Sequence, residues 1–187
     1  MCVGQVGNLL PHVVVPAVMV QYLMPLWGMT NTQAGLLAAA YAAGYMLAVP
    51  FLSSLTDRYD ARRILLIGSL CSGLSTLAFA LFATSWLTGM IIWGLAGVSF
   101  AGAYMPGLRA LTDRIEAANA SRSITLYTAS YSLGVGFSFL VSQLVADAFG
   151  WRWSFGITGL GPLIMALVAW RMKPVLPIPK DSHLLDV

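Results

Sequence analysis

Charged residues are scarce in this sequence. Only 9% of its 187 residues are Asp, Glu, Lys or Arg, whereas soluble domains carry roughly 25%. None occurs in residues 1–56 or in residues 64–108. Because a water-soluble fold of this size needs more charge to cover its surface, the composition excludes that class and indicates a protein embedded in a lipid bilayer.

Cysteine is rarer still, and no cofactor or metal motif is visible. Cys2 and Cys71 both fall in or beside apolar stretches, so a disulfide framework is not indicated. The first apolar stretch lacks a basic leader and a small-residue cleavage site, so we expect it to remain as a membrane span. We expect no cofactor and no metal.

Apolar stretches of the length that crosses a membrane fill most of the chain. A spanning helix needs roughly 20 apolar residues, and short polar turns with a Trp divide each uncharged block in two. The sequence thus predicts an all-α integral membrane protein with one domain at residues 1–175 and a tail at residues 176–187. We expect its six transmembrane helices at residues 3–26, 33–55, 64–83, 87–108, 123–146 and 153–172.

Basic residues favour one side of this topology. Nine of the ten Lys and Arg residues lie in the loops after the second, fourth and sixth spans, and Arg152 alone lies on the other side. The positive-inside rule therefore predicts a multi-pass protein of the cell membrane with both termini and the tail in the cytoplasm. The net charge of +3 follows from this topology, so the expected partner is the bilayer and not nucleic acid.

The chain also aligns with itself at an offset of 90 residues. Asp57 falls on Asp147 and Arg62 on Arg152, and several glycines and a proline match at the same offset. Three helices fit within the offset, so the second triplet must cross the membrane in the opposite direction. This predicts a 3+3 inverted repeat, with Asp147 and Arg152 in an external loop. The repeats would cover residues 1–84 and 87–174.

Residues 53–63 carry a recognisable motif. They read Ser-Ser-Leu-Thr-Asp-Arg-Tyr-Asp-Ala-Arg-Arg, which resembles the signature between the second and third helices of the major facilitator superfamily. That signature runs Gly, three residues, Asp, Arg or Lys, any residue, Gly, any residue, and two basic residues. The matching positions are Asp57, Arg58, Arg62 and Arg63.

Two positions depart from the signature, because Ser53 and Asp60 replace its glycines. Ser is small enough for close helix packing, and Asp tolerates the left-handed backbone conformation expected of Gly in a turn. The resemblance to the family extends over the whole chain, including Gly150-Trp151-Arg152 before the last span. It covers half of the usual twelve helices.

The resemblance implies transport of a small solute by alternating access, with this chain as one half of a secondary transporter. A second six-helix half or another copy of the chain would complete it. The cluster of Asp57, Arg58, Arg62 and Arg63 would then be a conformational latch, with Arg109 as the candidate partner of Asp57. An ordinary basic loop is the alternative.

Polar residues inside the spans are candidates for a substrate cavity. Gln5, Asn8 and His12 follow one another at helical spacing, so a continuous helix would place them on one face. Polar groups in a bilayer usually face a cavity or the bundle interior, although they also join helices by hydrogen bonds. His12 is the intramembrane group that can titrate near neutral pH.

Tyrosines form two further pairs, each with members one helical turn apart. We expect their hydroxyls to line the same cavity, although tyrosines also pack between helices. Trp93 occupies the position where proton-coupled members of the family often carry Arg, and Gly134 and Gly136 are not followed by the Gly-Pro of the antiporter signature, so drug/proton antiport is not supported. The candidate tyrosines are Tyr41, Tyr45, Tyr127 and Tyr131.

Two other functions remain open at this stage. The chain could be a non-transporting remnant or a membrane assembly protein. Six spans and a Gly-Val-Ser sequence ending at Ser99 also resemble an intramembrane serine protease, which would need a histidine beside the serine, and His12 is the one intramembrane candidate. We expect a transporter half and no enzyme, with a substrate that the sequence does not reveal.

Overall fold

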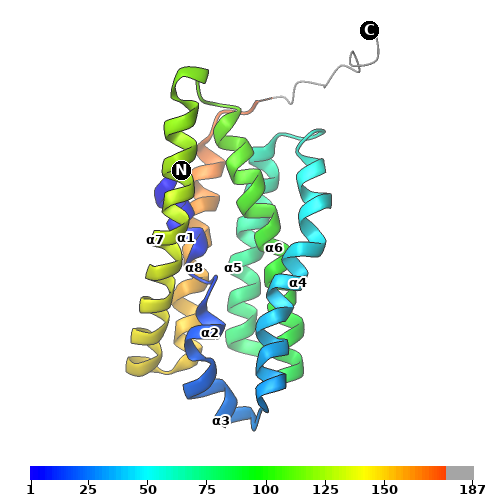
Figure 1. The fold of residues 1–187 in the computed structure, drawn as a ribbon, viewed down its shortest axis with the longest axis vertical. Helices are drawn as coiled ribbons and strands as arrows, with labels where there is room; N and C mark the ends of the chain where they lie inside the picture. Colours follow the sequence, from blue (N-terminus) through cyan, green and yellow to red (C-terminus); the bar gives the residue numbers. More distant parts are fainter. Residues whose placement is uncertain (176–187) are drawn as a thin grey trace.

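The computed structural model describes residues 1–175 and shows a bundle of helices (Figure 1), with no strand in that part of the chain. Five single helices are long and apolar enough to cross a membrane. The predicted tail at 176–187 lies outside the described residues. The five helices are α4 (Asn31–Leu55), α5 (Ala61–Phe82), α6 (Trp86–Thr112), α7 (Ala117–Phe149) and α8 (Trp151–Arg171).

The first span, expected at residues 3–26, is broken, so the prediction that Gln5, Asn8 and His12 share one helical face is wrong. A bend of 42° separates its two parts, and the pair counts as the sixth span. Pro11 lies in the break. It interrupts the helix because it has no N–H to donate to the preceding turn and its ring clashes with that turn. The pieces are α1 (Cys2–Leu9), α2 (Val14–Val18), the π-helical segment η1 (Met19–Leu23) and α3 (Met24–Trp27).

Short polar turns define where the helices begin. Thr30 caps α4 and Ser85 caps α6, each through a reciprocal hydrogen-bond pair with the residue three positions on. Asp60 caps α5 by accepting a hydrogen bond from the Arg62 backbone N–H. Its φ is −54°, so Asp60 does not adopt the left-handed conformation that both Gly and Asp tolerate. The residue replaces Gly as a cap.

Corresponding helices of the two triplets run in opposite directions. The Asp60 end of the bundle, at the top of Figure 1, holds the turns at 56–60 and 113–116; the opposite end, where α7 finishes, is the Asp147 end. α4 runs toward the Asp60 end and α7 away from it, and α5 and α8 are opposed in the same way. α4 packs on α6 and α7 on α1, while α5 and α8 pack on each other. The inverted order of two triplets is therefore present.

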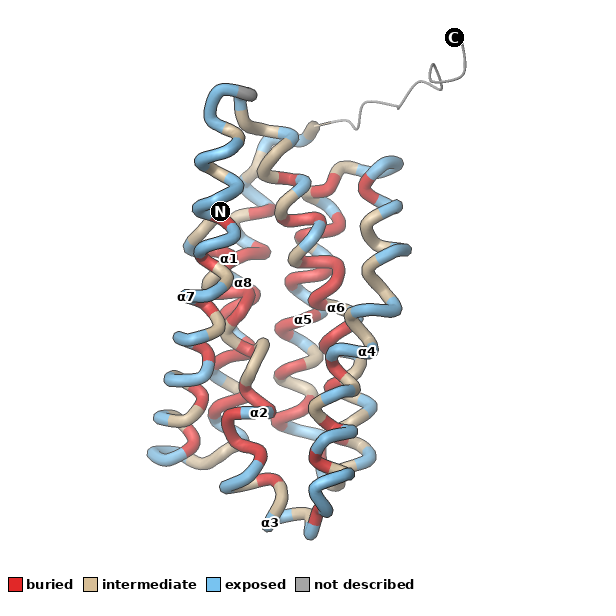
Figure 2. Tube along the Cα trace, viewed as in Figure 1, coloured by how far each residue is buried: buried red, intermediate tan, exposed pale blue. Residues whose placement is uncertain are grey.

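Glycines let these helices approach closely, and apolar side chains cover the outside. A Cβ at Gly97 would meet the backbone carbonyl of Tyr41, and one at Gly44 would meet that of Gly94. On the outer surface, Phe51 and Leu133 are more than two-thirds exposed. Figure 2 shows exposed residues along α4 and α7 and buried ones toward the bundle interior. An apolar exterior of this kind suits a bilayer.

Candidate functional site

His12 lies in the break of the first span, where two tyrosines hold it. Its Nδ1 is 3.2 Å from the hydroxyl of Tyr41 on α4, and its Nε2 is 2.9 Å from the hydroxyl of Tyr131 on α7. Both ring nitrogens are thus engaged. Because Tyr41 and Tyr131 correspond at the 90-residue offset, the two repeats each supply one partner.

A cavity of about 250 Å³ opens beside His12. It lies between α4, α6, α7 and the break. Met46 belongs to its wall and is 71% exposed, so the cavity reaches the outer surface of the bundle. The lining residues are His12, Tyr41, Ala42, Tyr45, Met46, Phe100, Tyr104 and Tyr131.

Three of the predicted cavity residues lie elsewhere. Gln5 and Asn8 are fully buried, and the break separates their helix from His12. Tyr127 donates a hydrogen bond of 2.8 Å to Gln5 Oε1, so this pair joins α7 to α1. Gln5 Nε2 and both polar atoms of Asn8 are buried and have no hydrogen-bond partner among the described residues. In this structure these three residues are part of the packed interior.

Sequence reasoning missed half of the cavity wall. Phe100 and Tyr104 are one turn apart on α6, which is the same spacing that identified Tyr41 and Tyr45. Their ring centroids are 6.0 Å apart and their planes nearly parallel. Trp93 packs with its ring centroid 4.9 Å from that of Tyr41. Trp93, which stands where proton-coupled members of the resembled family often carry Arg, therefore positions a cavity side chain.

Ser138 on α7 bridges the break itself. Its hydroxyl donates a hydrogen bond to the Leu10 carbonyl and accepts one of 3.4 Å from the Val13 N–H. Backbone groups released by a helix break inside a membrane must find partners within the protein. Ser138 therefore stabilises the irregular backbone that presents His12.

The expected pair of Asp57 and Arg109 does not form in this structure. Arg109 makes an ion pair of 2.9 Å with Asp113, one turn further along. The Asp57 side chain has no hydrogen bond or ion pair with another described residue, although it borders the same surface hollow as Arg109. Arg58 and Arg63 likewise make no side-chain hydrogen bond within residues 1–175.

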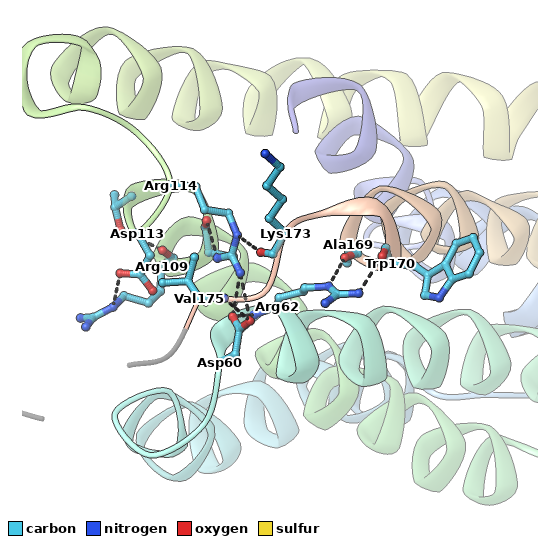
Figure 3. A network of polar contacts seen from close by, with 11 residues as sticks. Asp60, Arg62, Arg109, Asp113, Arg114, Ala169, Trp170, Lys173 and Val175 are labelled. Carbon is cyan, nitrogen blue, oxygen red and sulfur yellow. Dashed lines mark hydrogen bonds and ion pairs between the residues drawn. The ribbon is translucent and has the colours of Figure 1, made fainter. Parts of the chain in front are cut away.

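A different carboxylate organises this end of the bundle (Figure 3). Asp60 accepts hydrogen bonds of 2.8 and 3.1 Å from Arg114 Nη2 and one of 2.9 Å from the Val175 N–H. Arg114 Nε also donates to the Lys173 carbonyl. We call Asp60, Arg114, Lys173 and Val175 the Asp60 clamp. It joins the start of α5 to the end of α6 and to the segment after α8.

Hydrogen bonds and the charge of Arg114 keep Asp60 ionised in this clamp although both side chains are largely buried. The side chains of Asp60 and Arg114 are 9% and 14% exposed. Burial alone would raise the pKa of the Asp60 carboxyl, but hydrogen bonds from Arg114 and from the N–H groups of Val175 and Arg62 outweigh it and lower that pKa below its ordinary value. Asp60 is therefore ionised at neutral pH.

Arg62 is the one residue of the predicted latch that joins distant elements. Its Nε and Nη2 donate to the carbonyls of Ala169 and Trp170, at 2.8 and 2.7 Å. Those carbonyls lie in the last turn of α8, where a positive charge is favourable. Arg62 thus fastens α5 to α8 (Figure 3).

Polar contacts at the Asp147 end involve the predicted repeat-related loop. Asp147 accepts hydrogen bonds of 2.6 Å from Tyr22 and 3.0 Å from Gln143. The Arg152 guanidinium lies 5.2 Å from the centre of the Trp151 ring. Asp147 therefore has side-chain partners where Asp57 has none among the described residues, and Arg152 lies over an aromatic ring where Arg62 binds backbone carbonyls.

The protease hypothesis requires a contact that is not formed. The Ser99 hydroxyl donates to the Leu95 carbonyl at 2.9 Å and lies 3.5 Å from the Ser75 hydroxyl. His12 instead bonds two tyrosines and borders a different cavity. A nucleophile needs its base within hydrogen-bond reach, so the Ser99 and His12 side chains do not make a catalytic dyad here.

Fold and cavity together define a class: a multi-pass helical membrane protein with an inverted repeat and a cavity lined by tyrosines and a histidine at a broken span, an arrangement also found in secondary transporters. Comparison with known proteins identifies the family of this chain. The family model of the Major Facilitator Superfamily matches residues 1–184, and the chain belongs to this family.

Two of three curated relatives are named as transporters, and all three are longer than this chain. The chain is 27% identical over 83% of its length to the inner membrane transport protein YnfM of Escherichia coli, covering 38% of that protein. It is 29% identical over 79% of its length to the 4-hydroxybenzoate transporter PcaK of Acinetobacter baylyi, covering 32% of it. For human protein spinster homolog 1 the identity is 24% over 74% of the chain, and the coverage 27%. The chain thus spans less than two-fifths of these relatives.

Proposed function

We propose that this chain forms one half of a secondary transporter and that the cavity beside His12 is its part of the path of a small solute. The observation that carries the proposal is the cavity itself. It places a histidine and four tyrosines around about 250 Å³ between membrane-spanning helices. Polar groups are costly at that depth and mark substrate pathways.

The second half would be a six-helix chain of the same family or another copy of this one. Both termini would lie in the cytoplasm, in accord with the distribution of Lys and Arg. Of the three relatives, PcaK alone is named for a substrate, and similarity over 32% of its length does not fix the substrate of this chain. The solute would reach the cavity alternately from either side as the two halves rock.

Thiol accessibility tests the cavity. In a background with Cys2→Ser and Cys71→Ser, Ala42→Cys introduces a thiol in the cavity wall, and Leu74→Cys places one at a 62% exposed position in the middle of α5 that does not line the cavity. We expect a membrane-impermeant maleimide to label the first variant and spare the second, which lipid covers. Equal protection of both would remove the proposed path.

Transport itself is tested in proteoliposomes containing the chain alone or the chain with a second six-helix half. We expect solute exchange only where two halves are assembled, and we expect maleimide modification of the Ala42→Cys variant to block it. Labelling of the cavity without exchange in any assembly would instead favour a non-transporting remnant or assembly protein.

A further inference from the structure

We propose that the cavity binds one aromatic monocarboxylate together with one proton, and that the proton resides on His12 between Tyr41 and Tyr131. This proposal rests on the transport function above and specifies its substrate class. It follows from three properties of the cavity: the shape of its walls, the absence of fixed charge on them, and the hydrogen-bond arithmetic at His12.

The walls fit a planar ring. Phe100 and Tyr104 present nearly parallel rings, and the Tyr45 ring centroid is 5.8 Å from that of Phe100. The His12 ring is 5.0 Å from Phe100. Aromatic pairs prefer the offset and edge-to-face arrangements that such spacings allow. An apolar cavity of roughly 150 Å³ holds benzene, so about 250 Å³ has room for one ring with a small substituent.

The walls carry no fixed charge, since none of the lining residues is Asp, Glu, Lys or Arg. The titratable groups that face His12 are Tyr41 and Tyr45 from α4, Tyr104 from α6 and Tyr131 from α7. Tyrosines ionise near pH 10 and are neutral at physiological pH. An unpaired carboxylate is costly in such a site, and among these residues His12 is the group that can become cationic near neutral pH. A cationic ligand would find no carboxylate among these residues.

Hydrogen-bond counting shows what protonation changes. A neutral imidazole has one donor and one acceptor nitrogen, so one of its tyrosine partners must donate its O–H to His12, and the other retains its O–H for a ligand. A protonated imidazole donates through both nitrogens, to Tyr41 and Tyr131, and both hydroxyls are then available. Protonation thus supplies one further donor and one positive charge.

A carboxylate matches the protonated site. Its two oxygens can accept from the two released hydroxyls, and its charge is balanced by the imidazolium. One proton passes from water to His12 for each anion bound, no covalent bond changes, and the loaded site is neutral overall. A neutral complex is the form that crosses a low-dielectric interior at least cost.

Three matched probes test this, with the full chain in lipid nanodiscs: benzoate, uncharged benzamide and cationic phenyltrimethylammonium. Between about pH 7 and pH 8, above the ordinary histidine value, we expect the Kd of benzoate to fall by roughly tenfold for each unit of decreasing pH while His12 is neutral in the empty site, as uptake of one proton requires. Calorimetry in two buffers of different ionisation enthalpy should show one proton taken up per benzoate. Benzamide binding should change by less than about twofold, and the cation should not bind.

The His12→Gln variant isolates the proton. Gln retains one donor and one acceptor for the two tyrosines but cannot be protonated, so benzamide binding should persist while the pH dependence of benzoate binding and its proton uptake disappear. Tyr59→Phe, at an exposed turn, is the matched control and should behave as the unmodified chain. Proton uptake that survives in His12→Gln, or benzoate binding independent of pH, would overturn the proposal.

A thiol readout separates this proposal from the transport function. If Ala42→Cys is labelled but neither benzoate nor benzamide binds, the aromatic ligand class is wrong and the water-accessible path stands. If Ala42→Cys is protected from the maleimide and no probe binds, both proposals fail.

Discussion

Asp60 is the carboxylate that makes contacts between distant segments in the motif between the second and third spans. The family signature has Gly there, where no side chain is available, whereas this chain has a carboxylate that binds Arg114 and the backbone of Val175. Asp57, the residue the signature singles out, makes no such contact among the described residues. The acid that organises this end therefore lies three positions further along the chain.

Replacing Asp60 tests its role at the level of one residue. We expect Asp60→Asn to destabilise the folded chain by about 1 to 3 kcal/mol, because hydrogen bonds to an ionised group contribute about that much and Arg114 loses its counter-ion. Thermal unfolding in nanodiscs measures the effect. Asp57→Asn is the matched control and should change stability by less than about 0.5 kcal/mol; the reverse order would show that Asp57 is the organising carboxylate.

Acid should have the same effect as this substitution. The pKa of Asp60 is lower in the folded protein than in the unfolded chain, so its contribution to stability is complete above the unfolded value near 4 and is lost as pH falls through the lower folded value. We therefore expect the Asp60→Asn variant and the unmodified chain to approach the same stability in that acidic range. A difference that stays constant down to the lowest pH would contradict this assignment.

The broken first span is the element that creates the site. Without the break, His12 would continue the face of Gln5 and Asn8; with it, those two are buried while His12 meets Tyr41 and Tyr131. Pro11 interrupts the helix, and Ser138 supplies the hydrogen bonds that the backbone loses.

The Ser138→Ala variant tests that support. The Leu10 carbonyl and the Val13 N–H would lose their partner, and we expect a loss of about 1 to 3 kcal/mol in unfolding experiments. Thr125→Ala on the same helix removes an exposed hydroxyl that bonds only within its own helix, so it should have little effect. Equal losses in the two variants would mean that Ser138 does not support the break.

The packing of α4 on α6 positions the aromatic side chains that these two helices contribute to the cavity. A Cβ at Gly97 would press on the Tyr41 backbone, so we expect Gly97→Ala to separate the helices and destabilise the fold by about 1 to 3 kcal/mol, the usual effect of overpacking. Gly136→Ala is the control, because a Cβ there meets nothing within 4 Å and Ala favours a helix. Unfolding measurements compare the stability of the two variants. If Gly97→Ala is as stable as Gly136→Ala, the close approach of α4 to α6 at Gly97 is contradicted.

The whole molecule has two chemically distinct ends, and their orientation in the membrane is a prediction of the charge distribution. We expect Tyr59→Cys at the Asp60 end to be protected from an impermeant maleimide in intact cells, and Phe149→Cys at the Asp147 end to be labelled. Both positions are exposed, at 53% and 69%, so accessibility within the protein does not decide the result. Labelling only of Tyr59→Cys would reverse the predicted topology.

The sequence alone determined the number of spans, the family and the opposed triplets of helices. These follow from local composition: uncharged stretches of bilayer length, turns with Trp, and a repeat visible at one offset. Such features depend on whether lipid or water surrounds each segment. A bilayer requires every spanning segment to be apolar and to satisfy its own backbone hydrogen bonds. The tyrosines of α4 and α7 could be proposed as cavity residues for the same reason, because polar groups stand out in apolar spans.

Only the tertiary structure decided which polar groups face the cavity and which carboxylate forms the clamp. Helical spacing placed Gln5 and His12 on one face, but Pro11 ended that periodicity and Ser138, more than a hundred residues away, fixed the new backbone path. Asp60 and Arg114 are separated by 54 residues and meet because α5 and α6 pack side by side. Contacts between distant segments depend on how whole helices pack, and no local pattern encodes that geometry.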